Sequence, residues 1–119
     1  SIQQMEESVV FESVGGYQVA FALAPPILSQ KPAPRHLREK YSDVDVIVCL
    51  FAAPYKNHLV LGRKDSPLDL VSFCRSRGGG GRNNSGGFRR EQLITEAEYP
   101  AVREEIKVLL HDFIQSSSA

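Results

Sequence analysis

The stretch RSRGGGGRNNSGGFRR, residues 75–90, restricts the possible folds most strongly, because it places six glycines and five arginines in sixteen positions. A run of four glycines costs backbone entropy and removes every side chain that would keep a ligand away from the amides. Successive glycine amides can form an anion-binding concavity, and arginines add forked, charged hydrogen bonds to phosphate oxygens. Composition alone leaves two interpretations equally open: a folded loop that holds phosphate, or a flexible connector with solvated arginines.

The chain around this stretch has the size and composition of one globular domain. It has 119 residues, of which 42% are hydrophobic and 24% are charged. The formal net charge is zero, but residues 63–90 carry seven basic and two acidic side chains. Acidic residues outnumber basic ones on both flanks, by six to five in residues 1–62 and by six to two in residues 91–119. A neutral protein of this kind can still present one basic surface.

Hydrophobic patterns and turn residues divide the chain into strands and helices. Strands are predicted at 8–13, 17–24, 43–53, 58–65 and 86–90, and helices at 35–42, 66–77 and 99–115. The segment 43–53 is apolar enough for a central strand that is covered on both faces. Ser66 is the predicted N-cap of the second helix, Pro67 its first residue and Gly78 its end. This order predicts an α/β fold: a single domain with a mixed β-sheet of about five strands and about three helices.

Two familiar nucleotide-binding motifs do not fit the glycine-rich stretch. A P-loop needs a lysine followed by Ser or Thr and runs from a strand to a helix, whereas this stretch has no lysine and runs from a helix to a strand. In the dinucleotide-binding fingerprint the third glycine position would be occupied by Asn83 or Asn84. An anion would therefore be held by loop amides and arginines, without help from a helix N-terminus.

The order of residues within the stretch is similar to a known signature, GGGGHxxAAGF, of the DHH-associated C-terminal domain. The matching positions are Gly78 to Gly81, Arg82 at the family's His, Ser85 and Gly86 at its paired Ala positions, and Gly87 with Phe88 at its end. The upstream segment HLVLGRKD resembles the family's strand with a Leu-Arg pair, where Arg63 matches the arginine, and the resemblance extends over residues 17–90. Arg82 departs from the family's His, and arginine cannot titrate near neutral pH.

This resemblance implies a function for the whole chain. Residues 1–119 would form one DHH-associated C-terminal domain, a fragment of an oligoribonuclease-like or exopolyphosphatase-like phosphoesterase. Its ligand would be short RNA or DNA or the phosphate of a nucleotide. The residues expected to bind phosphate are Arg63, the amides of Gly79, Gly80 and Gly81, Arg82, Asn83 and Ser85. An N-terminal DHH catalytic domain would supply the catalytic residues and the manganese or magnesium, since this chain shows no catalytic or metal-ligand motif and needs no cofactor of its own.

The remaining features favour ordinary structural roles. Cys49 and Cys74 are far apart, without other ligands at metal-binding spacing, and are expected to be isolated thiols with structural roles, Cys49 within a buried run. Asp43 and Asp45 are expected to form an acidic entry to a strand. The absence of a long apolar run or a signal peptide predicts a cytoplasmic protein without a membrane contact. The alternative function is a stand-alone RNA-binding or interaction module in which residues 75–90 stay a flexible Arg/Gly segment.

Overall fold

The computed structural model describes residues 2–25, 32–63 and 65–117. These residues form four α-helices, one short 3-10 helix and six strands. In chain order the elements are α1 Ile2–Glu7, β1 Val10–Val14, β2 Tyr17–Ala24, α2 Pro32–Lys40, β3 Val46–Phe51, β4 Asn57–Gly62, α3 Leu70–Ser76, β5 Gly80–Arg82, β6 Ser85–Arg89, η1 Glu96–Glu98 and α4 Tyr99–Ser117.

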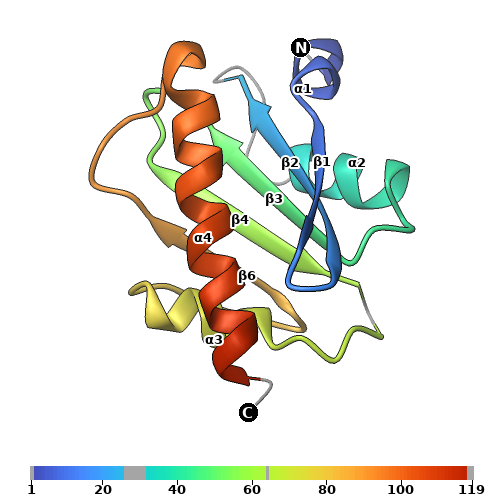
Figure 1. Ribbon diagram of the computed structural model, residues 1–119. Coiled ribbons are helices and arrows are strands. Elements are labelled where there is room, and N and C mark those ends of the chain that lie inside the picture. The colour runs from blue at the N-terminus through green and yellow to red at the C-terminus, as the bar shows by residue number, and fades with distance from the viewer. Residues whose placement is uncertain (1, 26–31, 64, 118–119) are drawn as a thin grey trace.

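The six strands form one mixed sheet in the order β1-β2-β3-β4-β6-β5. The β2 and β3 strands are parallel, and every other neighbouring pair is antiparallel. The helix α2 lies in the connection between the two parallel strands, as a parallel pair requires (Figure 1). The β5–β6 hairpin completes one side of the sheet, so β5 is an edge strand.

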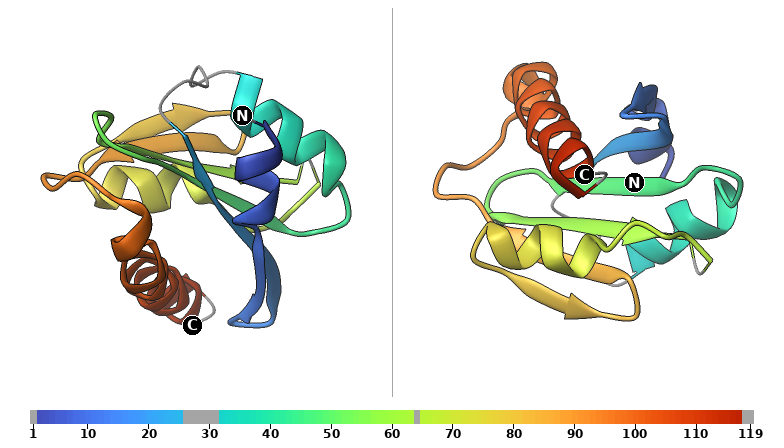
Figure 2. Two further views of the ribbon diagram at one scale, coloured as in Figure 1. Left: turned by 90° about the horizontal axis from the view of Figure 1, so that it is seen from above. Right: turned by 60° about the horizontal axis from the view of Figure 1, so that its bottom comes forward.

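Helices cover both faces of the sheet (Figure 2). One hydrophobic cluster lies between the sheet and α3 and α4, and it includes Phe21, Val48, Phe73, Ile106 and Leu110. The second lies between the opposite face and α1 and α2, and it includes Met5, Leu37, Ile47, Cys49 and Phe51. Because β3 contributes alternate residues to both clusters, its whole length is buried, which confirms the predicted central strand.

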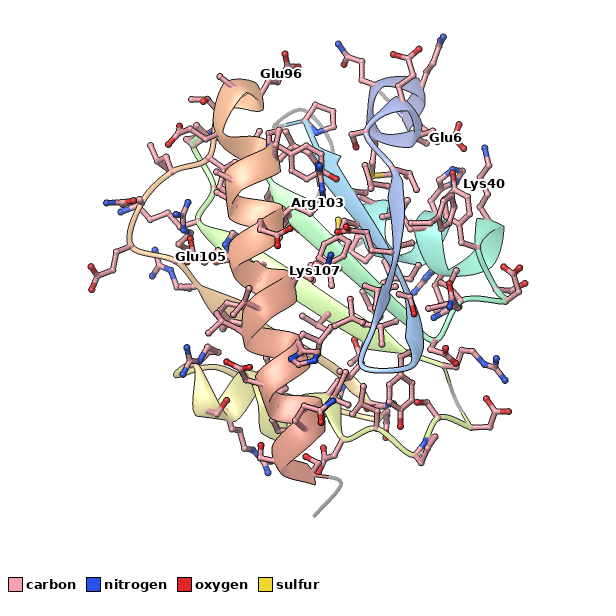
Figure 3. The ribbon with its side chains drawn as sticks, viewed as in Figure 1. Glu6, Lys40, Glu96, Arg103, Glu105 and Lys107 are labelled. Carbon is pink, nitrogen blue, oxygen red and sulfur yellow. The ribbon has the colours of Figure 1, made fainter. Side chains whose placement is uncertain are left out.

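Ion pairs fasten the helices at the edges of these layers. Lys107 of α4 donates a hydrogen bond of 3.0 Å to Glu12 of β1, and Glu105 accepts one of 3.2 Å from Arg90. On the other face, Lys40 of α2 donates to Glu6 of α1. Figure 3 shows Glu105 and Lys107 on α4 in one part of the molecule, and the contact between Glu6 and Lys40 in another. Helices α1, α2 and α4 are thus attached to the sheet or to a neighbouring segment by charge as well as by apolar packing.

The predicted fold class is confirmed: the chain is a single α/β domain with a mixed sheet. The structure differs from the prediction in detail, because the first helix, α1, and the strand β5 were not foreseen. The predicted N-cap was wrong, since α3 begins after Asp69, whose carboxylate accepts a hydrogen bond of 3.1 Å from the Ser72 amide. The Ser66 hydroxyl accepts from the Leu68 amide instead, in the turn that precedes the helix.

Candidate functional site

The glycine-rich stretch is a β-hairpin. The α3 helix ends at Ser76, and Gly78 follows with a φ of 85°, a conformation that glycine adopts without strain. Strands β5 and β6 are joined by Asn83 and Asn84, with φ values of 53° and 57°, as a type I′ turn requires. The alternative of a flexible Arg/Gly segment therefore does not match the structure, because backbone pairing and α3 hold residues 80–89 in place.

Two glycines of the tetrad are needed for the close approach of the hairpin's own strands. A Cβ atom at Gly79 would lie 1.9 Å from the Gly87 carbonyl oxygen, and one at Gly81 would lie 2.1 Å from the Ser85 carbonyl oxygen. A Cβ atom at Gly80 meets nothing within 4 Å. The Gly79 amide already donates a 2.9 Å hydrogen bond to the Cys74 carbonyl. Much of the glycine requirement is therefore structural. Gly78, where a Cβ atom also meets nothing within 4 Å, has a positive φ, so within β5 it is Gly80 that leaves room for a ligand.

The Asn84 side chain anchors the hairpin turn to two other segments. Its Oδ1 accepts a 3.0 Å hydrogen bond from the Leu70 amide at the start of α3, and its Nδ2 donates a 3.4 Å bond to the Arg63 carbonyl. Its backbone carbonyl accepts a 2.9 Å bond from the Gly62 amide at the end of β4. This residue, which the sequence did not single out, holds the turn beside Arg63.

Two substitutions of Asn84 separate the contribution of its side-chain hydrogen bonds to stability from the contribution of its backbone conformation. Asn84→Gly keeps a residue that tolerates positive φ but loses both side-chain bonds, so we expect it to lower the free energy of unfolding by about 1–3 kcal/mol. Asn84→Ala loses the same bonds and adds about 1 kcal/mol of left-handed backbone strain. Chemical denaturation of the two variants measures both effects. Equal stability of Asn84→Gly and the wild type would contradict the anchoring role.

A hollow of about 900 Å³ opens where β4 ends and the hairpin turn begins. Its lining combines two arginines, one carboxylate and several neutral hydrogen-bonding groups: Arg38, Ser42, Gly62, Arg63, Asp65, Asn83 and Asn84. Two of the predicted site residues, Arg63 and Asn83, therefore meet in one place although twenty positions separate them in sequence. Arginine with neutral donors around an open hollow is a composition suited to an anion.

Arg63 is held by two carboxylates. Its Nε and Nη2 donate hydrogen bonds of 3.3 Å and 3.1 Å to the two oxygens of Asp65, and its Nη1 lies 3.8 Å from Asp45. The hydrogen bond to Asp65 raises the pKa of Arg63 above its ordinary value, so its charge is permanent. Asp45 also accepts a 2.8 Å bond from the Gln18 amide, which fits the acidic strand entry expected for it.

Arg38, like Asn84, is a residue that sequence reasoning missed. Its Nη2 donates bonds of 2.7 Å and 2.8 Å to the carbonyls of Tyr41 and Val44, so the guanidinium is fixed against the chain that follows α2. Partial burial lowers its pKa, and the positive charge of Arg63 lowers it further. Because the two like charges repel, an anion bound between them would stabilise both. In the sequence Arg38 is one of several basic residues of a short helix, and nothing distinguishes it from Arg35 or Lys40.

The other predicted residues do not line this hollow. Ser85 lines a second hollow of about 490 Å³ on the α2 face of the sheet, and Arg38 lines both hollows. Arg82 pairs with Ser85 across the hairpin, so its side chain projects from the same face. Gly79 lines a third hollow with Leu59, which also lines the second. Gly80, Gly81 and Arg82 lie on the edge strand, outside these three hollows.

Other chemistry is not apparent in this part of the molecule. Burial raises the pKa of the Cys49 thiol to about 12 and that of Cys74 to about 11, so both thiols are protonated and unreactive. Among residues 2–25, 32–63 and 65–117, no group of three or more His, Cys, Asp or Glu side chains could hold a metal ion. None of the helices in these ranges combines the length and apolarity needed to cross a bilayer.

Comparisons with known proteins show a shared fold. No family model and no curated protein matches the sequence. A crystal structure of an uncharacterised protein from Helicobacter pylori G27 matches with a TM-score of 0.57 at 14% identity, over 90% of this chain and 29% of that one. PggH, a pGpG-specific phosphodiesterase from Vibrio cholerae, matches with a TM-score of 0.58 at 8% identity, over 90% of this chain and 36% of that one. The chain thus spans about a third of the length of these two proteins.

Proposed function

We propose that this chain is the substrate-binding domain of a DHH-family phosphoesterase and that it holds the phosphate of a nucleotide or a short nucleic acid. The observation that carries the proposal is the hollow in which Arg63 and Asn83 meet Arg38. The glycine tetrad and Arg63 resemble the DHH-associated C-terminal domain, from which Arg82 departs. The fold likeness to a pGpG-specific phosphodiesterase supports the same class of ligand.

Each residue has a defined role in this proposal. The planar guanidinium of Arg63 presents a fork of donors that matches two phosphate oxygens, and Arg38 adds a second, immobile positive charge. Asn83 and Ser42 contribute neutral donors at the rim of the hollow. Arg82 and Ser85 extend the contact along the α2 face, toward the rest of the ligand. Gly80 and Gly81 lie on an edge strand, where successive amides alternate between facing β6 and facing away from it, so one of the two can face a ligand.

Metal-dependent hydrolysis of the kind expected for this family would need a metal site. Among the described residues, no group of three or more His, Cys, Asp or Glu side chains could hold a metal ion. The proposed arrangement therefore assigns the metal and the chemical step to a separate DHH catalytic domain, and it assigns to this chain the binding and orientation of the phosphate. The chain alone is expected to bind nucleotides weakly and to hydrolyse none of them when manganese or magnesium is present.

The binding test uses a fluorescent RNA dinucleotide with a 5′-phosphate, titrated by anisotropy. We expect Arg63→Ala to weaken binding about tenfold or more, because it removes a forked and charged contact. Arg38→Ala is expected to weaken it as well, and affinity should fall as salt rises from about 50 to 200 mM.

Arg75→Ala is the matched control, because Arg75 is exposed on α3 and outside the three hollows. It should leave the affinity within about twofold of the wild type, since it removes only a distant and screened charge. Thermal unfolding of each variant shows whether it is folded. Equal binding by the Arg63→Ala and Arg75→Ala proteins would sink the proposal, as would metal-dependent hydrolysis by this chain alone.

A further inference from the structure

We propose that Asp65 is an internal competitor of the ligand: in the free protein its carboxylate occupies the guanidinium fork of Arg63 that a phosphate would take. This inference rests on the proposed function, because it concerns the same arginine. It adds that the site is closed by its own chain until the ligand displaces Asp65.

The geometry of the contact is that of a bound oxyanion. Arg63 uses Nε and Nη2, two adjacent donors, and each reaches a different oxygen of the same carboxylate, at 3.3 Å and 3.1 Å. A phosphate presents two oxygens to an arginine in the same forked manner. The Asp65 carboxylate and a phosphate therefore cannot occupy these donors together.

Exposure distinguishes Asp65 from the second carboxylate beside Arg63. The Asp65 side chain is 74% exposed, whereas that of Asp45 is 28% exposed. Asp45 is also bound to the Gln18 amide of the neighbouring strand, and it lies 3.8 Å from Arg63, beyond hydrogen-bond distance. Asp65 can turn into solvent, while the hydrogen bond from the Gln18 backbone amide keeps Asp45 in place near Arg63. The structure thus contains one fixed and one displaceable carboxylate.

The strength of an exposed ion pair sets the expected effect. In the closed form Asp65 is bound to Arg63, and in the open form it is not. Exposed ion pairs favour the closed form over the open form by a factor of about 1.4 to 5. A ligand that binds only the open form has its apparent dissociation constant raised by the inverse of the open fraction, which is about two- to sixfold here. The contact is weak enough to be displaced and strong enough to be measured.

The experiment compares the wild type with five variants, using the same labelled, 5′-phosphorylated dinucleotide and inorganic phosphate as a competitor. The variants are Asp65→Asn, Asp65→Ser, Asp43→Asn, Arg63→Ala and the Arg63→Ala/Asp65→Asn double variant. Asp65→Asn should tighten binding about two- to sixfold. Asp43→Asn is the matched control, because Asp43 acts on Arg63 through its charge without appearing among its hydrogen-bond or ion-pair partners. It should tighten binding less. Asp65→Ser removes both the carboxylate and the longer side chain that an asparagine would keep. It should act like Asp65→Asn.

The double variant separates displacement from long-range repulsion. Without Arg63 there is no fork to occupy, so Asp65→Asn should then tighten binding no more than Asp43→Asn does. An equal gain in both backgrounds, or no gain in either Asp65 variant, would overturn the competitor role while leaving the proposed function intact. Unchanged binding by Arg63→Ala would overturn the proposed function itself, and the competitor role with it.

Discussion

Gly81→Ala is expected to lower the free energy of unfolding by about 3 kcal/mol or more, whereas Gly80→Ala should change it by less than about 1 kcal/mol. A Cβ atom at position 81 would lie 2.1 Å from a backbone oxygen of the paired strand, so the hairpin must open. At position 80 the same atom meets nothing within 4 Å. Thermal unfolding should show the Gly81 variant melting more than about 10 °C below the Gly80 variant.

The Gly80→Ala protein also tests the role of the tetrad in binding. Because it is expected to fold normally, any loss of affinity reports a ligand close to the backbone of β5. Normal folding with normal affinity would restrict the ligand to the arginine hollow. A Gly81→Ala protein as stable as Gly80→Ala would contradict the close approach of the two hairpin strands at Gly81.

Acidification is expected to destabilise the protein between pH 6.5 and about 4, chiefly through His58. This side chain is 1% exposed in β4, and burial lowers its pKa to about 4, with a smaller contribution from the positive charge of Arg90. The ring lies edge-on to Phe88, with a centroid distance of 5.4 Å, and Nδ1 lies 3.1 Å from the Asn57 carbonyl, to which it can donate. Among the described residues Nε2 has no hydrogen-bond partner.

The direction of the effect follows from the proton balance. Above pH 6.5 the imidazole is neutral in both the folded and the unfolded states, so stability does not depend on its titration. Between pH 6.5 and about 4 the unfolded chain binds a proton that the folded chain does not, so stability falls with pH. A difference of about 2.5 pKa units corresponds to a loss of about 3 kcal/mol.

Urea denaturation at a series of pH values measures this loss. His58→Phe keeps an aromatic ring against Phe88 and removes the titration, so it should flatten the profile between pH 6.5 and 4; His58→Gln is a second variant for the case in which phenylalanine packs poorly. His111 is the control, since its side chain is 51% exposed on α4. If the His111→Gln profile is flattened as much as the His58 profile, burial of His58 is not the cause.

The sequence predicted those parts of the fold whose side-chain pattern decides the structure. Within the predicted segment 43–53, residues Val46–Phe51 form the central strand, because their apolar side chains satisfy both faces of the sheet. The C-terminal helix formed because its apolar residues recur at helical spacing. The strand β5 could not be predicted in this way, because glycine has no side chain to pack and disfavours strands. It forms because Gly79 and Gly81 let two backbones approach more closely than any Cβ atom would permit.

The candidate site was only partly predictable for a related reason. Arg63 and Asn83 were found through a signature in the sequence, but Arg38 and Asn84 belong to the site through contacts that exist only after folding. Arg38 and Asn84 could therefore be identified only from the folded chain.

The N-cap of α3 could not be identified from the sequence either. Ser66 and Asp69 are both good capping residues. Leu68 and Leu70 are both buried in the core, and helix α3 begins at Leu70, directly after Asp69.

The bonds of Asn84 have a consequence for the affinity of the site. The end of β4, the start of α3 and the tip of the hairpin are tied by one residue, so folding already holds the backbones of Asn83 and Arg63 close together. The conformational entropy cost of bringing these groups together is met when the chain folds, so it does not reduce the free energy of ligand binding. On this side the hollow is preorganised, and displacement of a single carboxylate is the rearrangement that remains.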